Sequence, residues 1–275
     1  MLKSILKKQR EKNGSLIAFN VQNITHLEIL KNCTSNLELP VIAQLSSRYI
    51  PYWEQRIGLK NLINSYQNEL LFFHLDHCNK VETIKQCIDS GFSGVMYDGS
   101  SYQIDVNIKE TNQVFEYIKS NNKDVVLEAE LGSIVGIEDG FKGALVADYY
   151  SPKDLDVFLK NANFDVLALA IGNAHGVYET TSDVKPELLL QATRKNPTLN
   201  LVLHGGTGLP DSMIKKCIKY GVVKINVSTE LKIKTQLALK KYVNKSDSFN
   251  ESDWFEEANT ALTPFFENYI KKYTK

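Results

Sequence analysis

The chain has 275 residues, enough to bury one large hydrophobic core, and its 32 lysines and arginines balance its 32 aspartates and glutamates. This balance argues against a partner such as nucleic acid or an anionic membrane, and no apolar run is long enough to span a bilayer. The four cysteines have neither disulfide nor metal-site spacing, which favours a reduced, cytoplasmic protein.

Strand-like apolar runs alternate with amphipathic helical stretches along the chain. Residues 1–10 are basic and partly apolar without the features of a signal peptide, so we expect a surface helix there. The apolar runs predict strands at residues 15–20, 40–46, 70–76, 94–98, 124–131, 164–171, 199–204 and 222–227. Helical spacing predicts helices at residues 24–35, 57–68, 80–90, 105–121, 152–161, 184–195, 210–219 and 229–242.

Eight strand–helix units in sequence indicate an α/β fold of the (β/α)8 barrel type, with an open doubly wound sheet as the alternative. Residues 46–56, after the second strand, and the polar residues 243–253 are expected to be loops. Residues 254–272 are expected to form an additional C-terminal helix. No linker divides the chain, so residues 1–275 are expected to form a single domain.

Ionisable residues follow three of the predicted strands. Asp76 and His77 end the third strand, His175 follows the sixth, and His204 follows the seventh. Carboxyl ends of parallel strands meet at one face of a barrel, so the three imidazoles are expected to converge. Three histidines with an open fourth position match a catalytic zinc site, whereas any one of them alone is more often structural.

Five segments around these residues carry a resemblance to a known family. Residues 74–100, 128–139, 171–178, 203–208 and 224–230 resemble, in order, the motifs of the class II, zinc-dependent ketose-bisphosphate aldolases. The resemblance covers roughly residues 14–242 and points to the fructose-bisphosphate and tagatose-bisphosphate branch.

The resemblance assigns roles to acidic residues. It makes Asp76 the catalytic acid/base, with a carboxylate that only orients a metal-bound histidine as the alternative. It makes Glu138 the proton-transfer residue of a glycine-rich loop that closes over substrate. Asp98 and Glu130 become a secondary metal site, or else a buried hydrogen-bond network.

Two glycine- and hydroxyl-rich loops are predicted to hold a phosphate. Barrels of this kind commonly bind phosphate after strands seven and eight, at the N-terminus of the final helix. Gly176 is expected to contact a phosphate or a monovalent cation (Na⁺ or K⁺), and Asn20 and Ser46 either line the pocket or cap their strands. The predicted phosphate-binding residues of the two loops are Gly205, Gly206, Thr207, Asn226, Val227, Ser228 and Thr229.

The sequence also departs from the family pattern. Cys78, Tyr97 and Ser101 replace residues that are usual in the motifs, and no arginine follows Arg194. Two of the four arginines, Arg48 and Arg56, lie in the segment after the second strand, where they either recognise the acceptor aldehyde or are plain surface residues.

The resemblance implies a zinc-dependent lyase of carbohydrate metabolism or glycolysis. It would reversibly cleave a ketose (bis)phosphate to dihydroxyacetone phosphate and an aldehyde such as glyceraldehyde 3-phosphate. A catalytically silent barrel with a binding or regulatory role is the alternative, which the complete residue set argues against; a zinc hydrolase lacks support because no His-x-His follows the first strand. The apolar helix at 254–272 predicts a homodimer or homotetramer, unless it packs only on its own barrel.

Overall fold

The computed structural model describes residues 1–134, 136–138, 141–142, 149–176, 181, 183–244 and 250–275. Its barrel strands are β1 (Leu16–Asn20), β2 (Val41–Ser46), β3 (Leu71–Cys78), β4 (Gly94–Tyr97), β5 (Val126–Leu131), β8 (Val166–Leu169), β9 (Leu201–Leu203) and β10 (Val222–Val227). These strands are all parallel and close in the order β1-β10-β9-β8-β5-β4-β3-β2. The prediction of a (β/α)8 barrel with an additional C-terminal helix is confirmed.

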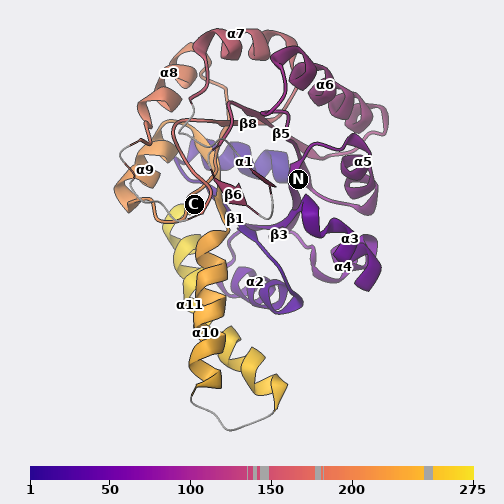
Figure 1. Cartoon of the computed structure of the whole chain (residues 1–275), viewed down its shortest axis with the longest axis vertical. Helices are drawn as coiled ribbons and strands as arrows, with labels where there is room; N and C mark the ends of the chain where they lie inside the picture. Colours follow the sequence, from indigo (N-terminus) through magenta and orange to yellow (C-terminus); the bar gives the residue numbers. More distant parts are fainter. Residues whose placement is uncertain (135, 139–140, 143–148, 177–180, 182, 245–249) are drawn as a thin grey trace.

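Helices surround the ring of strands, as Figure 1 shows. None of the described helices is long and apolar enough to cross a membrane. Their bounds are α1 (Leu2–Glu11), α2 (Ile24–Leu37), the 3₁₀ helix η1 (Ser47–Tyr49), α3 (Ile50–Arg56), α4 (Leu59–Tyr66), α5 (Val81–Ser90), α6 (Ile104–Ser120), α7 (Pro152–Asn161), α8 (Glu187–Lys195), α9 (Asp211–Lys219), α10 (Thr229–Val243) and α11 (Glu251–Tyr273).

The strands are buried on both faces, which explains their continuous apolar runs. In β3, Leu71 and Phe73 belong to the outer core beneath the helices, whereas Phe72 belongs to a separate inner cluster. The next inward positions are His74 and Asp76, both at most 1% exposed. The interior of the barrel is therefore apolar at its lower end and polar towards the carboxyl ends of the strands.

The helix expected at the N-terminus is confirmed, but its position on the surface was wrong. Helix α1 lies across the end of the barrel opposite the carboxyl ends of the strands and is seen within the ring of strands in Figure 1; its Leu2 and Leu6 belong to the inner apolar cluster with Phe72 and Val166. Both leucines are at most 2% exposed. An amphipathic helix can bury its apolar stripe against any part of a core, and here it closes the barrel.

The expectation of a loop over residues 46–56 was also wrong. This segment forms η1 and α3, and Ile50 and Trp53 of α3 are buried. Pro51 stands in the first turn of α3, where the missing N–H leaves no hydrogen bond unmade. The segment thus holds its arginines on a helical frame.

The last two helices form a hairpin that extends beyond the barrel (Figure 1). The C-terminal half of α11 packs on the barrel, where the ring centroids of Phe266 and Phe19 lie 4.6 Å apart. At the other end, Phe255 is 49% exposed. Residues 245–249, within the predicted loop at 243–253, lie outside the described residues.

Candidate active site

Three histidines meet at the carboxyl ends of the barrel strands. One ring nitrogen each of His77, His175 and His204 lies within 4.8 Å of the others. His77 is the penultimate residue of β3, and the other two follow β8 and β9. His204 is fully buried and His77 is 5% exposed. The structure therefore brings together the three residues that the sequence predicted as zinc ligands.

A bulge in β3 lets two consecutive residues face this centre. The pairing of β3 with β4 shifts register between Leu75 and Cys78, and His77 has a φ of 43°. In a regular strand Asp76 and His77 would point to opposite faces. The bulge instead turns His77 towards the barrel mouth beside Asp76, while Cys78 joins the outer core.

Two carboxylates fix the orientation of two of the imidazoles. Asp98 Oδ2 lies 2.8 Å from His77 Nδ1, and Glu128 Oε1 lies 2.8 Å from His204 Nε2. A carboxylate can only accept, so each of these ring nitrogens carries a hydrogen. The nitrogens left for a metal are His77 Nε2 and His204 Nδ1, which lie 3.0 Å apart. Two zinc ligands at about 2.0–2.1 Å from the ion lie roughly this close, so the donor set fits a tetrahedral zinc site.

The charges around the histidines are strongly coupled. Burial opposes a charge on His77, but Asp76 and Asp98 outweigh it and raise the His77 pKa. Burial would raise the pKa of Asp98, but its hydrogen bond and ion pair with His77 bring that pKa below its usual range. Burial lowers the pKa of His204, which favours its neutral, metal-binding form.

A second possible metal cluster adjoins the first. His77, Asp98 and Glu130 also offer ligand atoms within 4.8 Å of one another. Glu130 Oε2 lies 3.6 Å from His204 Nδ1, and burial followed by the charge of Asp98 raises the Glu130 pKa. Ser100 donates from its N–H and its hydroxyl to Asp98 Oδ1. Asp98 and Glu130 thus lie where either predicted role, metal ligand or hydrogen-bonding residue, is possible.

Asp76 is held by amides on either side. Asn20 Nδ2 donates to Asp76 Oδ2 at 2.7 Å, and Asn226 Nδ2 lies 3.4 Å from Asp76 Oδ1. Gln44 Nε2 in turn donates to Asn20 Oδ1. Asn20 therefore contacts the predicted catalytic carboxylate directly, as a residue that lines the pocket would. Ser46 is paired in register with Asp76 and is 4% exposed.

The two predicted phosphate loops and the loop after β8 line one small cavity. Gly176 and Gly205 have φ values of +100° and +65°, and Ser228 precedes the first turn of α10. Ser228 Oγ is buried without a hydrogen-bond partner among the described residues, a group that an anion would satisfy. The lining residues are His175, Gly176, Gly205, Thr207, Asn226, Ser228 and Thr229.

Two predicted phosphate residues do not line this cavity. Gly206 N donates to the Asn226 carbonyl, and a Cβ there would meet Ile225 at 2.9 Å. Val227 is fully buried in the outer core. Both residues therefore support the loops without facing the cavity.

Glu138 lies on β6 (Ile137–Glu138), which pairs with β7 (Phe141–Lys142) in an antiparallel hairpin. The side chain of Glu138 lies outside the described residues, as does most of 139–148. A Cβ at Gly136 would lie 2.4 Å from the His175 carbonyl oxygen, so the backbone before β6 packs closely against the backbone of His175.

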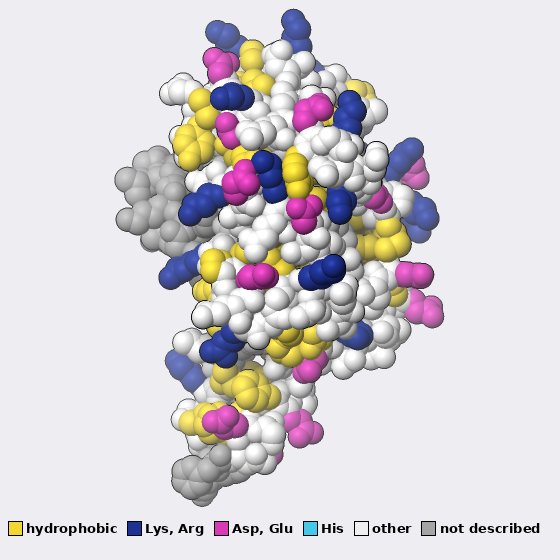
Figure 2. Space-filling view, turned by 90° about the vertical axis from the view of Figure 1, so that its right-hand side faces the viewer, with side chains coloured by type: hydrophobic (Ala, Val, Ile, Leu, Met, Phe, Trp, Pro, Cys, Tyr) yellow, Lys and Arg dark blue, Asp and Glu magenta, His cyan; other side chains and the backbone are white. Residues whose placement is uncertain are grey.

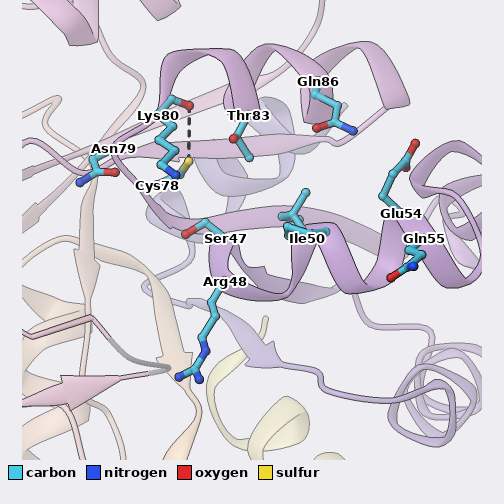
Figure 3. A pocket seen from close by; sticks show the side chains of 11 residues that line it. Ser47, Arg48, Ile50, Glu54, Gln55, Cys78, Asn79, Lys80, Thr83 and Gln86 are labelled. Atoms are coloured by element: carbon cyan, nitrogen blue, oxygen red, sulfur yellow. Dashed lines mark hydrogen bonds between the residues drawn. The ribbon is translucent and has the colours of Figure 1, made fainter.

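The two arginines after β2 have different surroundings. Arg48 lines a cavity of about 810 Å³ between α3 and α5, together with Ser47, Asn79 and Lys80. Figure 3 shows its side chain extending away from α5, with Glu54 and Gln55 towards the other end of the cavity. Ser47 Oγ donates to the main-chain carbonyl of His77 at 2.5 Å, so this cavity lies next to the backbone of His77. The Arg56 guanidinium lies 5.0 Å from the Tyr52 ring, and Arg56 is not among the lining residues.

Sequence reasoning assigned no role to Glu128 and Lys224, which lie in the layer beneath the histidines. Glu128 Oε2 accepts from Lys224 Nζ at 2.8 Å, and neither side chain is more than 1% exposed. A signal was present, because each is a charged residue inside an apolar strand. Their pairing across 96 residues could not be read from the sequence.

Known proteins are similar to this chain over most of its length. Two relatives are 6-phospho-5-dehydro-2-deoxy-D-gluconate aldolases: one from Halalkalibacterium halodurans is 33% identical over 83% of this chain and 80% of that protein, and one from Bacillus velezensis is 31% identical over 84% and 80%. A fructose-bisphosphate aldolase from Staphylococcus aureus is 32% identical over 84% of this chain and 82% of its own length.

Solved structures show the same fold. The YdjI aldolase from Escherichia coli K12 superposes with a TM-score of 0.82 at 23% identity, covering 99% of this chain and 96% of that one. The sequence model of the family described as "Fructose-bisphosphate aldolase class-II" matches residues 1–275. The resemblance seen in the sequence is confirmed, and the chain belongs to the class-II fructose-bisphosphate aldolase family.

Proposed function

We propose that the protein is a zinc-dependent aldolase that reversibly cleaves a ketose phosphate into dihydroxyacetone phosphate and an aldehyde. One observation carries this proposal: His175 belongs both to the cluster of three imidazoles and to the glycine-lined cavity at the start of α10. A metal and a phosphate-binding loop that share a residue suit a substrate whose carbonyl lies close to a phosphate.

We infer that His77, His175 and His204 hold the zinc ion. A zinc ion held by these residues would supply Lewis-acid chemistry, polarising the carbonyl of the ketose. Asp98 and Glu128 present His77 and His204 to it through the hydrogen bonds described above. Asp98 and Glu130 are the candidate ligands of a second metal position.

Proton transfer is assigned to two carboxylates. In cleavage, Asp76 takes the proton of the acceptor-half hydroxyl while the carbon–carbon bond breaks and its electron pair passes to the donor half. Glu138 then returns a proton to that donor carbon. Asp76 lies beside His77 and is fixed by Asn20 and Asn226, which supports its part in this scheme.

The donor phosphate is assigned to the cavity at the start of α10. The N-terminus of α10 and the Ser228 hydroxyl, which is buried without a partner among the described residues, suit an anion. A monovalent cation, Na⁺ or K⁺, beside Gly176 would offset part of the phosphate charge. Dihydroxyacetone phosphate would then place its carbonyl towards His175.

The acceptor half of the substrate is less closely defined than the donor half, which carries the phosphate. The relatives act, by name, on a bisphosphate or on a gluconate derivative that carries one phosphate and a carboxylate, so the far end of the substrate is anionic in both. We propose that Arg48, beside the cavity that adjoins His77, binds that anionic end.

A coupled assay for dihydroxyacetone phosphate tests the function. The protein is incubated with fructose 1,6-bisphosphate, tagatose 1,6-bisphosphate and 6-phospho-5-dehydro-2-deoxy-D-gluconate, each with and without a chelator. Release that the chelator abolishes and zinc restores is expected, and His204→Ala should lose both zinc and activity. Release from none of the three, or full zinc and activity in His204→Ala, would refute the proposal.

Arg56 supplies a matched control for the acceptor site. Arg48→Ala should raise the KM for the ketose about tenfold or more, because a charge-assisted contact is lost. Proton exchange on dihydroxyacetone phosphate alone should not change, since the donor half does not reach this arginine. Arg56→Ala should leave both unchanged. An unchanged KM in Arg48→Ala would remove Arg48 from the site.

We further propose that the enzyme works in the cytoplasm on small sugar phosphates, without nucleic acid or membrane partners, as a homodimer or homotetramer. The four cysteines are buried thiols, consistent with a reducing compartment. On the face drawn in Figure 2, positive and negative side chains are interspersed and form no extended basic surface.

A further inference from the structure

The ammonium group of Lys224 is fully buried in the barrel interior. Lys224 is 0% exposed, in a strand whose other residues include Val222, Val223 and Ile225. A lysine is almost never buried without partners, because removing its charge from water is costly. Its Nζ has two: Glu128 Oε2 at 2.8 Å and Asn226 Oδ1 at 2.9 Å.

The first partner, Glu128, connects Lys224 to the three histidines. Glu128 accepts from Lys224 with one oxygen and from His204 Nε2 with the other. Lys224 thus fixes the carboxylate that holds the hydrogen of His204 on Nε2 and leaves Nδ1 facing the cluster. All three side chains are at most 1% exposed, so water does not compete for these contacts.

The second partner, Asn226, connects Lys224 to Asp76. A lysine can only donate, so the amide oxygen of Asn226 must face Lys224 and its NH₂ must face the other way. There it meets Asp76 Oδ1 at 3.4 Å. If the Asn226 amide turned over, its oxygen would face the Asp76 carboxylate, and two acceptors would repel.

We propose that Lys224 is a positioning residue that sets two parts of the site at once: the metal-binding face of His204 through Glu128, and the Asp76 carboxylate through Asn226. This inference rests on the proposed aldolase function for the role of Asp76, whereas the contact with His204 concerns metal binding alone. The competing explanation is that Lys224 only neutralises the buried charge of Glu128.

Two variants separate these explanations. Lys224→Met keeps the length of the side chain and removes both contacts. The double variant Glu128→Gln/Lys224→Met removes both charges together, and the Gln oxygen can still accept from His204. Val223→Ala, also buried in β10 but in the inner apolar cluster, controls for a weakened strand.

Three measurements are made on each protein: zinc affinity by competition with a chelator, imidazole ¹⁵N shifts of His204 in the zinc-free protein, and turnover at saturating zinc. For Lys224→Met we expect zinc affinity to fall by about 10- to 100-fold. Turnover should stay at least about tenfold low after zinc is restored, because Asn226 no longer orients Asp76.

The double variant should keep His204 protonated at Nε2 and bind zinc within a few-fold of the natural protein. Its turnover should remain low, because the contact with Asn226 is still missing. Full turnover in the double variant would show that Lys224 is only a counter-charge, and natural zinc affinity in Lys224→Met would remove its link to His204. If the natural protein binds zinc but releases no dihydroxyacetone phosphate, the proposed function fails while the zinc and ¹⁵N measurements still judge the His204 contact.

Discussion

At the scale of single residues, the site depends on which way each polar group faces. The bulge at His77, the carboxylates on two imidazoles and the amides around Asp76 each choose one orientation from several that the sequence allows. Such choices give polar networks their specificity, because a buried donor or acceptor that faces the wrong way loses its partner outright.

Asp76→Asn tests the role of the carboxylate. The amide has almost the same shape but cannot accept a proton, so we expect zinc content to be kept and turnover to fall by about 10² or more. Turnover and bound zinc are measured on the same preparation. Loss of zinc, with normal turnover in the fraction that keeps it, would instead make Asp76 a group that only supports His77.

At the scale of elements, the repeating pattern of the chain predicted the barrel, and the exceptions have physical reasons. Helix α1 was predicted as a helix but not in its buried position, because one apolar stripe looks the same whether the helix lies on the surface or closes the end of the barrel. Helix α3 was missed because seven residues with a proline in the first turn resemble a loop. The strand-end histidines were identifiable, whereas Glu128 and Lys224 needed the closed barrel to bring them together.

Leu6→Ala tests whether α1 is part of the core. Leu6 is 2% exposed in the inner cluster, so its truncation should lower the free energy of unfolding by about 2–5 kcal/mol, measured in urea. Val106→Ala, on a residue of α6 that is 43% exposed, should cost less than about 0.5 kcal/mol. Equal small effects from both would place α1 outside the core.

Asp211 links α9 to the end of α11 and gives a pH-dependent test. Hydrogen bonds from Lys215, and then from Lys272 and Tyr273, lower its pKa to about 2. Because the folded pKa lies below the unfolded value of about 3.9, the stabilisation is complete above that value and is lost as pH falls towards 2.

Asp211→Asn should therefore lower stability at pH 7, by less than about 1 kcal/mol since the side chain is 37% exposed. The difference from the natural protein should shrink between pH 4 and pH 2, as chemical denaturation at each pH would show; a constant difference would contradict this.

At the scale of the whole molecule, the projecting hairpin of α10 and α11 has apolar side chains that its own barrel does not cover. Leu237 and Val243 are 55% and 54% exposed on α10, and Phe255 is 49% exposed on α11. The part of α11 that packs on the barrel agrees with the alternative that this helix packs only on its own barrel. The exposed part of the hairpin supports contact with a second subunit.

We expect a dimer or tetramer by light scattering at micromolar concentration. Leu237→Lys should shift the mass towards the monomer, because a charge would enter an apolar contact. Val106→Lys, a similar change on α6, should not. A monomeric mass for the natural protein would refute the oligomer.

The closed lower end of the barrel has a consequence for how water reaches the polar layer. Among the described residues, Leu2, Leu6 and the rest of the inner cluster fill the interior on the side of Glu128 and Lys224 away from the mouth, so we expect hydrogens in that layer to exchange with solvent mainly through the mouth. The end of the barrel that α1 covers is therefore closed among the described residues. A ligand that covers the mouth should slow deuterium uptake in β5 and β10, including at residues that the ligand does not contact. Hydrogen exchange in these strands would then report whether the site is occupied, without an assay of turnover.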